Sequence, residues 1–220
     1  MEKFGVGQSV TRKEDNELLT GAGIFQDDLN LEGQLYAVFL RSPYAHANIE
    51  NIDITEAKKM DGVVAIFTGK DLKLDGIGTI PCVMDEFVEL KLPDGQHAYY
   101  PPNALLPDDR VRHVGEAVVM IIADTPDIAR NAAEIININY NELKCVVDTN
   151  LAESPDCPNL WPEAPNNLSF VWEQGNKIET QAAFQQADKI VSVNIVNSRV
   201  IVNPIETRGA LAIYDQTKKR

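Results

Sequence analysis

Residues 110–143 constrain the fold more than any other part of this 220-residue chain. Residues 118–123 are an unbroken apolar run of strand length, which is typical of a strand buried on both faces. Thr125 and Pro126 then suit the start of a helix, Thr125 as its cap and Pro126 as its first residue. From Ile136 onward apolar residues recur at every second position, which predicts another strand. The sequence therefore predicts a compact strand–helix–strand unit on which the rest of the core packs.

The predicted helix has one apolar face, on which Ile128, Ala132 and Ile135 lie at spacings of four and three residues. Asp127 falls in its first turn, where the helix dipole favours negative charge.

The chain before this unit predicts further strands and short helical turns. Residues 34–41 form a strand that is apolar on both faces and that ends at Ser42 and Pro43. A second strand covers 47–54, where the spacing from Ile49 to Ile52 breaks the period of two and predicts a bulge. The remaining expected elements are a short helix at 56–60, a strand at 63–67, a helical turn at 70–72 and a strand at 110–114. Residues 1–20 are expected to be irregular, and 21–28 to be a loop that enters a short strand.

Two segments rich in proline and glycine interrupt this pattern. Residues 74–107 predict a long excursion with little regular structure and one short strand near 89–92. Residues 155–165 mark the boundary between two domains. Beyond it we expect a strand at 167–172, a helix at 178–187, alternating strands at 189–197, 199–202 and 209–214, and a turn at 215–218.

Composition excludes several classes of function. The net charge of −13 argues against nucleic acid and anionic membranes as partners, because both require basic patches. No apolar stretch is long enough to span a membrane, and the N-terminus lacks the apolar segment of a signal peptide. Cys82, Cys145 and Cys157 are odd in number and widely spaced, so they predict neither a disulfide framework nor a zinc site. We expect a reducing, cytoplasmic setting.

Few residues are candidates for chemistry. The histidines, His46, His97 and His113, lack the HxH or HExxH spacing of metal ligands and are better interpreted as structural or surface residues. Glu116, next to Gly115 at a strand start, is either a catalytic base or a turn carboxylate bound to backbone N–H groups. Glycine pairs at 21–23 and 76–78 lack the context of a dinucleotide-binding loop.

Residues 203–209 are dense in functional residue types. Glu206 and Arg208 are close enough in sequence to share one site, although a bend with an exposed ion pair explains them equally well. From the residues alone, no complete active site emerges.

Four stretches, taken in order, resemble the start of the molybdopterin-binding large subunit of the xanthine dehydrogenase family, which includes aldehyde oxidoreductases and aerobic carbon monoxide dehydrogenases. They read LLTGAGIFQDD (18–28), LRSPYAHA (40–47), VRHVGEAV (111–118) and NPIETRGALA (203–212). The stretch DGVVAIFTGKDL (61–72) fits the same family. Each motif alone is weak, but the ordered set is specific and covers nearly the whole chain.

The resemblance implies an α+β fold with four parts. An N-terminal segment would cover residues 1–17, an α/β hammerhead domain 18–147, a linker 148–164, and the start of the first molybdopterin-binding domain 165–220. It also implies hydroxylation of an aldehyde or N-heterocycle with oxygen from water, or oxidation of CO. Electrons would leave the molybdopterin through [2Fe-2S] clusters to FAD, often on separate subunits.

The resemblance carries over no catalytic, cofactor-binding or metal residue, because the family's cofactor loop, active-site loop and catalytic glutamate lie beyond residue 220. The chain would therefore be inactive alone and hold no cofactor, and would contact the rest of the large subunit, the iron–sulfur subunit and the FAD subunit. The alternative is a non-enzymatic assembly module that docks on those subunits. The last predicted strands lack a partner, so we also expect an exposed apolar edge that promotes a homodimer or aggregation.

Overall fold

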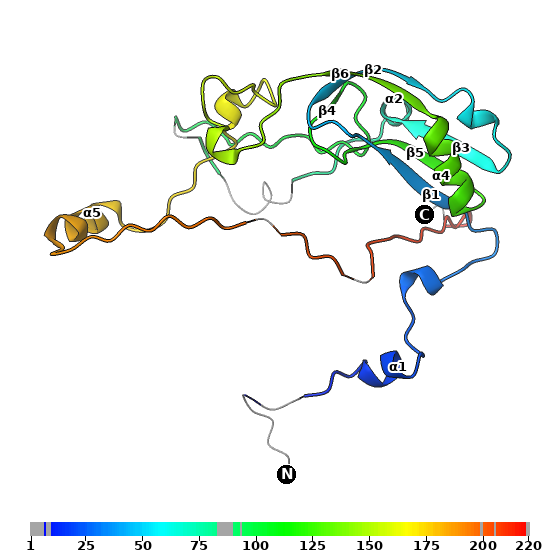
Figure 1. The fold of residues 1–220 in the computed structure, drawn as a ribbon, viewed down its shortest axis with the longest axis horizontal. Helices are drawn as coiled ribbons and strands as arrows, with labels where there is room; N and C mark the ends of the chain where they lie inside the picture. Colours follow the sequence, from blue (N-terminus) through cyan, green and yellow to red (C-terminus); the bar gives the residue numbers. More distant parts are fainter. Residues whose placement is uncertain are drawn as a thin grey trace, which may run out of the picture. The chain divides into compact units, whose positions relative to one another are not determined.

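A computed structural model describes residue 7 and residues 10–82, 90–92, 94–198, 200–204 and 206–218 (Figure 1). The chain divides into two compact units. One is Leu35–Asp188 and contains both sheets. The other combines Met1–Gln34 with Lys189–Arg220. The mixture of helices and antiparallel strands confirms the predicted α+β class.

The first sheet has three antiparallel strands in the order β1-β5-β3, formed by β1 (Tyr36–Arg41), β5 (Ala117–Ala123) and β3 (Val63–Thr68). Strand β5 is central, and Val118, Val119 and Ile121 are fully buried, as the apolar run predicts. β1 is an edge strand whose burial alternates, so only one of its two apolar faces is covered. Phe39 on β1 remains 42% exposed.

The second sheet has the order β4-β2-β6, with β4 (Arg110–Val111), β2 (Ala47–Asp53) and β6 (Asn137–Glu142). All its pairings are antiparallel. The register of β2 on β6 shifts between Ile49 and Asn51, which confirms the predicted bulge. The bulge lets Ile49 and Ile52 pack against the core although they are three residues apart.

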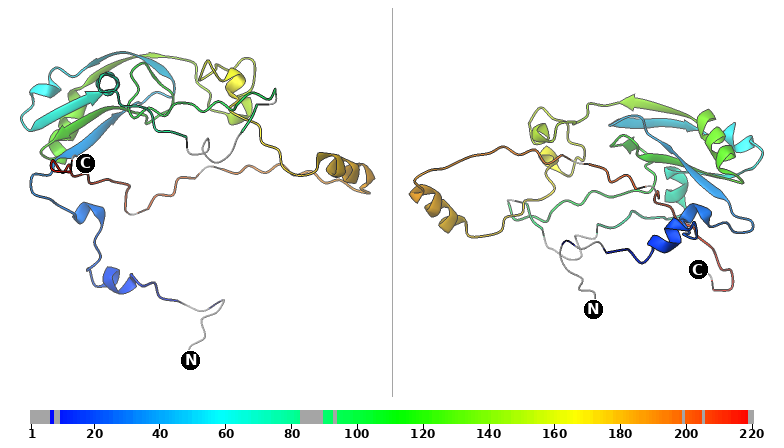
Figure 2. Two further views of the ribbon diagram at one scale, coloured as in Figure 1. Left: turned by 180° about the vertical axis from the view of Figure 1, so that it is seen from behind. Right: turned by 60° about the horizontal axis from the view of Figure 1, so that its bottom comes forward.

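Helix α4 (Pro126–Ile135) connects β5 to β6, so the predicted strand–helix–strand elements are confirmed, although the two strands belong to different sheets (Figures 1 and 2). The Thr125 hydroxyl accepts a hydrogen bond from Ile128 N at 3.2 Å, which is the predicted cap. Ala129 and Ala132 are fully buried and let the helix approach the sheet closely. The assignment of Ile135 to this face is wrong, because Ile135 is 48% exposed. Ile136 is buried in its place.

One hydrophobic core joins α4 and both sheets. Its buried members come from seven segments of the chain: Ala47, Ala57, Ile66, Val111, Val118, Val119, Ile121, Ala123, Ala129, Ala132 and Ile136.

Two short helices flank β3. The predicted helix at 56–60 is a single 3-10 turn, η2 (Ala57–Lys59). The predicted turn after β3 is helix α2 (Gly69–Leu74), which Thr68 and Asp71 cap reciprocally. A side chain at Gly69 would stand 2.6 Å from the Pro107 carbonyl, so only glycine allows residues 107–108 to pack there.

Residues 74–107 contain few regular contacts within the described part, as predicted. Ile80 forms an isolated bridge with Asn103, and Lys91 with His97 and Val171. Residues 83–89 and 93 lie outside the described residues; within 90–92 the strand expected near 89–92 is reduced to the bridges of Lys91.

The later part of the same unit contains η3 (Thr149–Leu151), η4 (Pro165–Asn167) and α5 (Lys177–Gln186), of which α5 was predicted. The strand expected at 167–172 is reduced to the single bridge of Val171.

The second unit contains α1 (Asp15–Leu19) and η1 (Gln26–Asp28). Residues 15–19 and 26–28 are therefore helical where irregular structure and a strand were expected, while residues 21–25 form the predicted loop. The strands expected at 189–197, 199–202 and 209–214 are absent from the described residues, because a strand requires a hydrogen-bonded partner and none lies beside them. The predicted turn is confirmed: the Asp215 carboxylate accepts bonds from the N–H groups of Thr217 (2.8 Å) and Lys218 (3.2 Å).

Candidate functional site

Two of the sequence motifs, 40–47 and 111–118, contact each other directly. Ser42 N donates to the Glu116 carbonyl at 2.8 Å, and Gly115 N donates to the Ser42 carbonyl at 2.8 Å. The Arg41 guanidinium donates to the Gly115 carbonyl at 2.8 Å. Gly115 has a φ of +85°, a conformation that glycine adopts without strain. These hydrogen bonds therefore fix the end of β1 to the residues that precede β5.

Of the two roles that the sequence left open for Glu116, catalytic base or turn carboxylate, the structure supports the turn carboxylate. Its carboxylate accepts a hydrogen bond from Arg112 N at 2.6 Å, and its side chain is only 17% exposed. His113 Nδ1 lies 3.6 Å from the same carboxylate oxygen. The carboxylate thus satisfies a backbone N–H within the turn, which is the alternative to a catalytic base.

His46 is buried against the residues that follow the end of β6. Its Nδ1 lies 2.8 Å from the Lys144 carbonyl, so the proton of a neutral ring is on Nδ1. Leu143 N donates to the His46 carbonyl at 2.9 Å, which fixes the same two segments from the backbone side. His97 and His113 are both exposed, and the fold does not gather the three histidines.

Two tyrosines pack against each other near the end of β1. The rings of Tyr44 and Tyr140 are 5.1 Å apart and tilted by 49°. Burial is the main cause that raises the pKa of Tyr140, while the nearby Ser42 side chain acts in the opposite direction. Tyr140 therefore remains a neutral phenol well above physiological pH.

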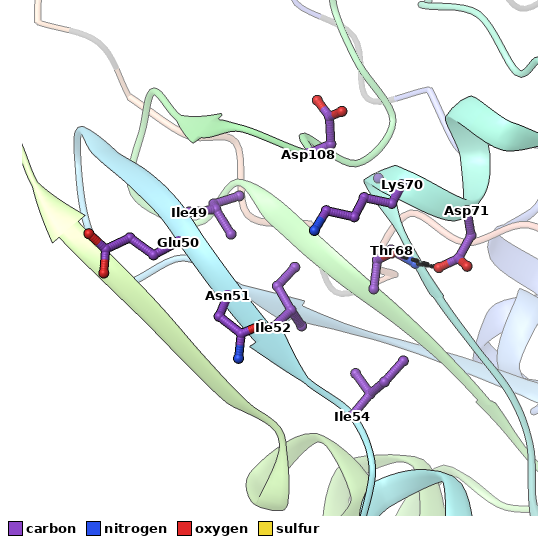
Figure 3. Close-up of a pocket in the computed structure, with 10 residues that line it drawn as sticks. Ile49, Glu50, Asn51, Ile52, Ile54, Thr68, Lys70, Asp71 and Asp108 are labelled. Carbon is purple, nitrogen blue, oxygen red and sulfur yellow. Dashed lines mark hydrogen bonds between the residues drawn. The ribbon is translucent and has the colours of Figure 1, made fainter.

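A small cavity of about 170 Å³ lies between β2 and the start of α2 (Figure 3). Ile49, Ile52 and Ile54 form its apolar side. Two of its three carboxylates, those of Asp71 and Asp108, have partners: Asp71 accepts from Thr68 N (2.7 Å) and Thr68 Oγ1 (2.6 Å), and Asp108 pairs with Lys73 at 3.1 Å. The Thr68 hydroxyl is the main cause that lowers the pKa of Asp71. The cavity is smaller than ligand pockets, which span roughly 300–1,000 Å³.

A cation–π contact holds residues 148–172 against the end of β4 in the same unit. The Arg112 guanidinium lies 3.8 Å from the centre of the Trp161 ring, and the Arg112 side chain is only 15% exposed. Tyr99 packs 6.3 Å from the same ring and exchanges backbone and side-chain hydrogen bonds with Ser169 at 3.0 and 2.6 Å. Sequence reasoning missed this cluster; a tryptophan within a proline-rich stretch was the only signal for it.

The other two motifs, 18–28 and 203–212, also meet. Gln26 N donates to the Glu206 carboxylate at 2.9 Å across 180 residues of sequence. Gly209 packs against the side-chain amide of Gln26. Among the described residues no ion pair joins Glu206 to Arg208, so the alternative interpretation, a bend with an exposed ion pair, is not formed.

Metal-binding clusters and membrane-spanning helices were sought in the residues that the structure describes. Within them, no three His, Cys, Asp or Glu side chains gather as a metal site would require. No described helix has the length and apolarity that crossing a bilayer demands. All three cysteines are free thiols.

Comparison with known proteins gives two family matches. Residues 20–144 match the model described as "Aldehyde oxidase and xanthine dehydrogenase, a/b hammerhead domain". Residues 160–220 match that of a molybdopterin cofactor-binding domain.

Individual relatives agree with these matches. The nicotine 6-hydroxylase large subunit of Paenarthrobacter nicotinovorans is 34% identical over 98% of this chain and 25% of its own length. The carbon monoxide dehydrogenase large chain of Afipia carboxidovorans is 29% identical over 97% of this chain and 26% of its own length. The chain thus spans about a quarter of these relatives.

Solved structures give the same result. A crystal structure of Cu,Mo-CO dehydrogenase superposes with a TM-score of 0.67 at 29% identity, and covers 84% of this chain and 23% of that one. Quinoline 2-oxidoreductase from Pseudomonas putida 86 superposes with a TM-score of 0.58 at 33% identity, and covers 71% and 19%.

The residues that match the molybdopterin-binding model do not fit the cofactor by themselves. Beside α5 they form an open hollow of about 690 Å³, lined by exposed side chains. Its one cation, Lys177, pairs with Glu173 at 3.6 Å. A phosphate-bearing pterin requires fixed N–H donors or free cations, whereas here the cation is paired and the N–H of Glu179 at the start of α5 already bonds to Asn176.

Proposed function

The chain belongs to the aldehyde oxidase and xanthine dehydrogenase family, and from this premise we propose that it acts as the scaffold-forming N-terminal part of a molybdenum hydroxylase large subunit. In this role it contributes structure and subunit contacts and has no turnover of its own.

One observation carries the proposal: the motif residues that mark the family are used for structure. Glu116 satisfies the backbone N–H of Arg112. Glu206 satisfies that of Gln26. A carboxylate committed to a backbone donor is a poor general base, because abstracting a proton would break that bond. The two motif contacts therefore support a scaffold.

The cofactors and the reaction belong to the assembled enzyme in this proposal. The rest of the large subunit holds the molybdopterin, and iron–sulfur and FAD subunits carry [2Fe-2S] and FAD. The molybdopterin would supply the redox chemistry for water-derived hydroxylation of an aldehyde or N-heterocycle, or for CO oxidation. The three free cysteines support a reducing, cytoplasmic location.

A second candidate is a non-enzymatic assembly module that docks on iron–sulfur or FAD subunits. It is favoured by the exposed apolar side chains in residues 190–202, such as Val193 (73% exposed) and Ile201 (92% exposed). Such a segment is suited to add a strand to a partner sheet, or to a second copy in a homodimer.

The test is to purify the chain alone and after co-expression with the rest of the large subunit and the two smaller subunits from the same organism. Molybdenum, pterin, iron and flavin content are measured in both preparations, together with dye reduction by aldehydes, N-heterocycles and CO.

The proposal expects molybdenum and dye reduction only in the co-expressed complex. Dye reduction by the purified chain alone would refute its inactivity. A complex with the smaller subunits that lacks molybdenum would favour the assembly module instead.

A further inference from the structure

One face of the first sheet is apolar and lies outside the hydrophobic core. In a sheet, paired residues point to the same side and successive residues alternate. Val38, Ile121 and Ile66 are paired in one row and pack in the core. The neighbouring rows must therefore point to the opposite side.

Two such rows cross all three strands in register. Phe39 pairs with Met120, which pairs with Phe67; Ala37 pairs with Ile122, which pairs with Ala65. We call these six residues the open face: Ala37, Phe39, Ala65, Phe67, Met120 and Ile122.

Burial agrees with this geometry. Ala37 and Phe39 on β1 are exposed and the other four residues of the open face are half-buried, and none of the six packs against the core cluster. Phe39 is 42% exposed. At the other end of β5, Val118 is fully buried in the core, so the face is covered there and is most exposed along β1.

The composition of the open face is unusual for a solvated surface. An antiparallel sheet with one wet face normally alternates apolar and polar residues along each strand. Here β1, β3 and β5 carry apolar residues on both sides, and the Arg41 guanidinium at the margin of the face lies 5.9 Å from the centre of the Phe39 ring. Contiguous apolar patches of this kind mark sites of protein contact.

We propose that the open face is the docking surface for the rest of the large subunit. This inference rests on the proposed function. The occupant follows from length: the chain spans about a quarter of its relatives, so most of a subunit of that family lies outside these residues. The partner surface is apolar, since no charge in the two rows offers a salt bridge.

The experiment co-expresses the tagged 220-residue chain with the rest of the large subunit, as a separate polypeptide from the same organism, and measures co-purification. Phe39→Asp puts a charge at the centre of the face. Ala37→Glu adds a charge without deleting any packing atom, and serves where Phe39→Asp fails to fold. The matched control is Leu74→Asp, since Leu74 is 86% exposed and lies on α2, outside the face.

We expect Phe39→Asp and Ala37→Glu to weaken co-purification by about tenfold or more, the scale of a central interface residue, while Leu74→Asp binds like wild type. Oxidation of Met120 by peroxide, read by mass spectrometry, should be slower in the complex than in the free chain.

Each other outcome overturns the inference in a distinguishable way. If wild type and the face variants co-purify equally and Met120 oxidises equally, the face assignment is wrong but the proposed function stands. If wild type captures nothing, the proposed function fails and the inference fails with it. If the chain alone is a dimer that Phe39→Asp dissociates, the occupant is a second copy.

Discussion

At the scale of single residues, hydrogen bonds from backbone N–H groups to carboxylates decide between the roles that the sequence leaves open. Glu116 and Glu206 both have the chemistry of a general base, and a sequence shows only that chemistry. The structure gives each carboxylate a backbone N–H at 2.6 and 2.9 Å. No periodicity encodes such a contact, because the donor of the Glu206 bond lies 180 residues away.

Replacing Glu116 tests its role. Glu116→Ala leaves the Arg112 N–H without its charged acceptor, so we expect a loss of about 1.5–3 kcal/mol in the free energy of unfolding. Glu116→Gln retains an acceptor oxygen and should lose less. Urea denaturation measures both. A Glu116→Gln variant with unchanged stability whose complex loses turnover would instead support a catalytic base.

Tyr140 predicts a dependence on alkaline pH. Burial raises the pKa of Tyr140 above its ordinary value of 10.0. The folded state then holds this proton more tightly than the unfolded state, so the stabilisation is fully present below pH 10 and is lost as pH rises through the folded pKa. Tyr140→Phe should lose stability less steeply than wild type above pH 10. Parallel stability curves in alkaline urea titrations would contradict this.

At the scale of secondary-structure elements, those elements whose partners lie nearby in sequence were predictable. The apolar run of β5, the Thr125 cap of α4 and the bulge in β2 are local signals, and all three are confirmed. The strands expected within 189–214 were not found, because alternation records only a tendency, and pairing requires a second backbone. β1 shows a related limit: its sequence is apolar on both sides, but the described contacts cover one side.

The two capped helices offer a matched comparison. Thr125→Ala removes the cap of α4, whose Ala129 and Ala132 are buried in the core, so we expect a loss of about 0.5–2 kcal/mol in the free energy of unfolding. Asn176 caps α5 by accepting from Glu179 N at 3.1 Å, but every residue of α5 is exposed. Asn176→Ala should reduce only local helicity. Urea curves followed by circular dichroism distinguish the two, and equal losses would contradict the assignment of α4 to the core.

At the scale of the whole molecule, acidity and exposed apolar surface have opposite effects on association. The net charge of −13 opposes self-association through repulsion. The exposed apolar residues in 190–202, including Val191 at 84% and Ile195 at 83%, favour it. Salt screens the first effect and leaves the second, so association should increase with ionic strength.

This balance is measurable by light scattering. We expect the mass of the chain alone to rise with protein and salt concentration, and Val193→Lys combined with Ile195→Lys to reduce the rise. Both positions are more than 70% exposed, so the change removes no core packing. A monodisperse monomer with full amide protection across 188–214 would show that these residues are already paired.

The contact between Arg112 and Trp161 gives the molecule an optical property. The chain has two tryptophans, and the second, Trp172, is 64% exposed. Trp172→Phe therefore leaves one indole, which lies under a guanidinium at 3.8 Å. Its fluorescence should report when residues 148–172 detach, and Arg112→Met should shift the emission toward that of a solvated indole. With that one substitution, Trp161 becomes a single fluorescent probe near residue 160, where the match to the molybdopterin-binding domain begins.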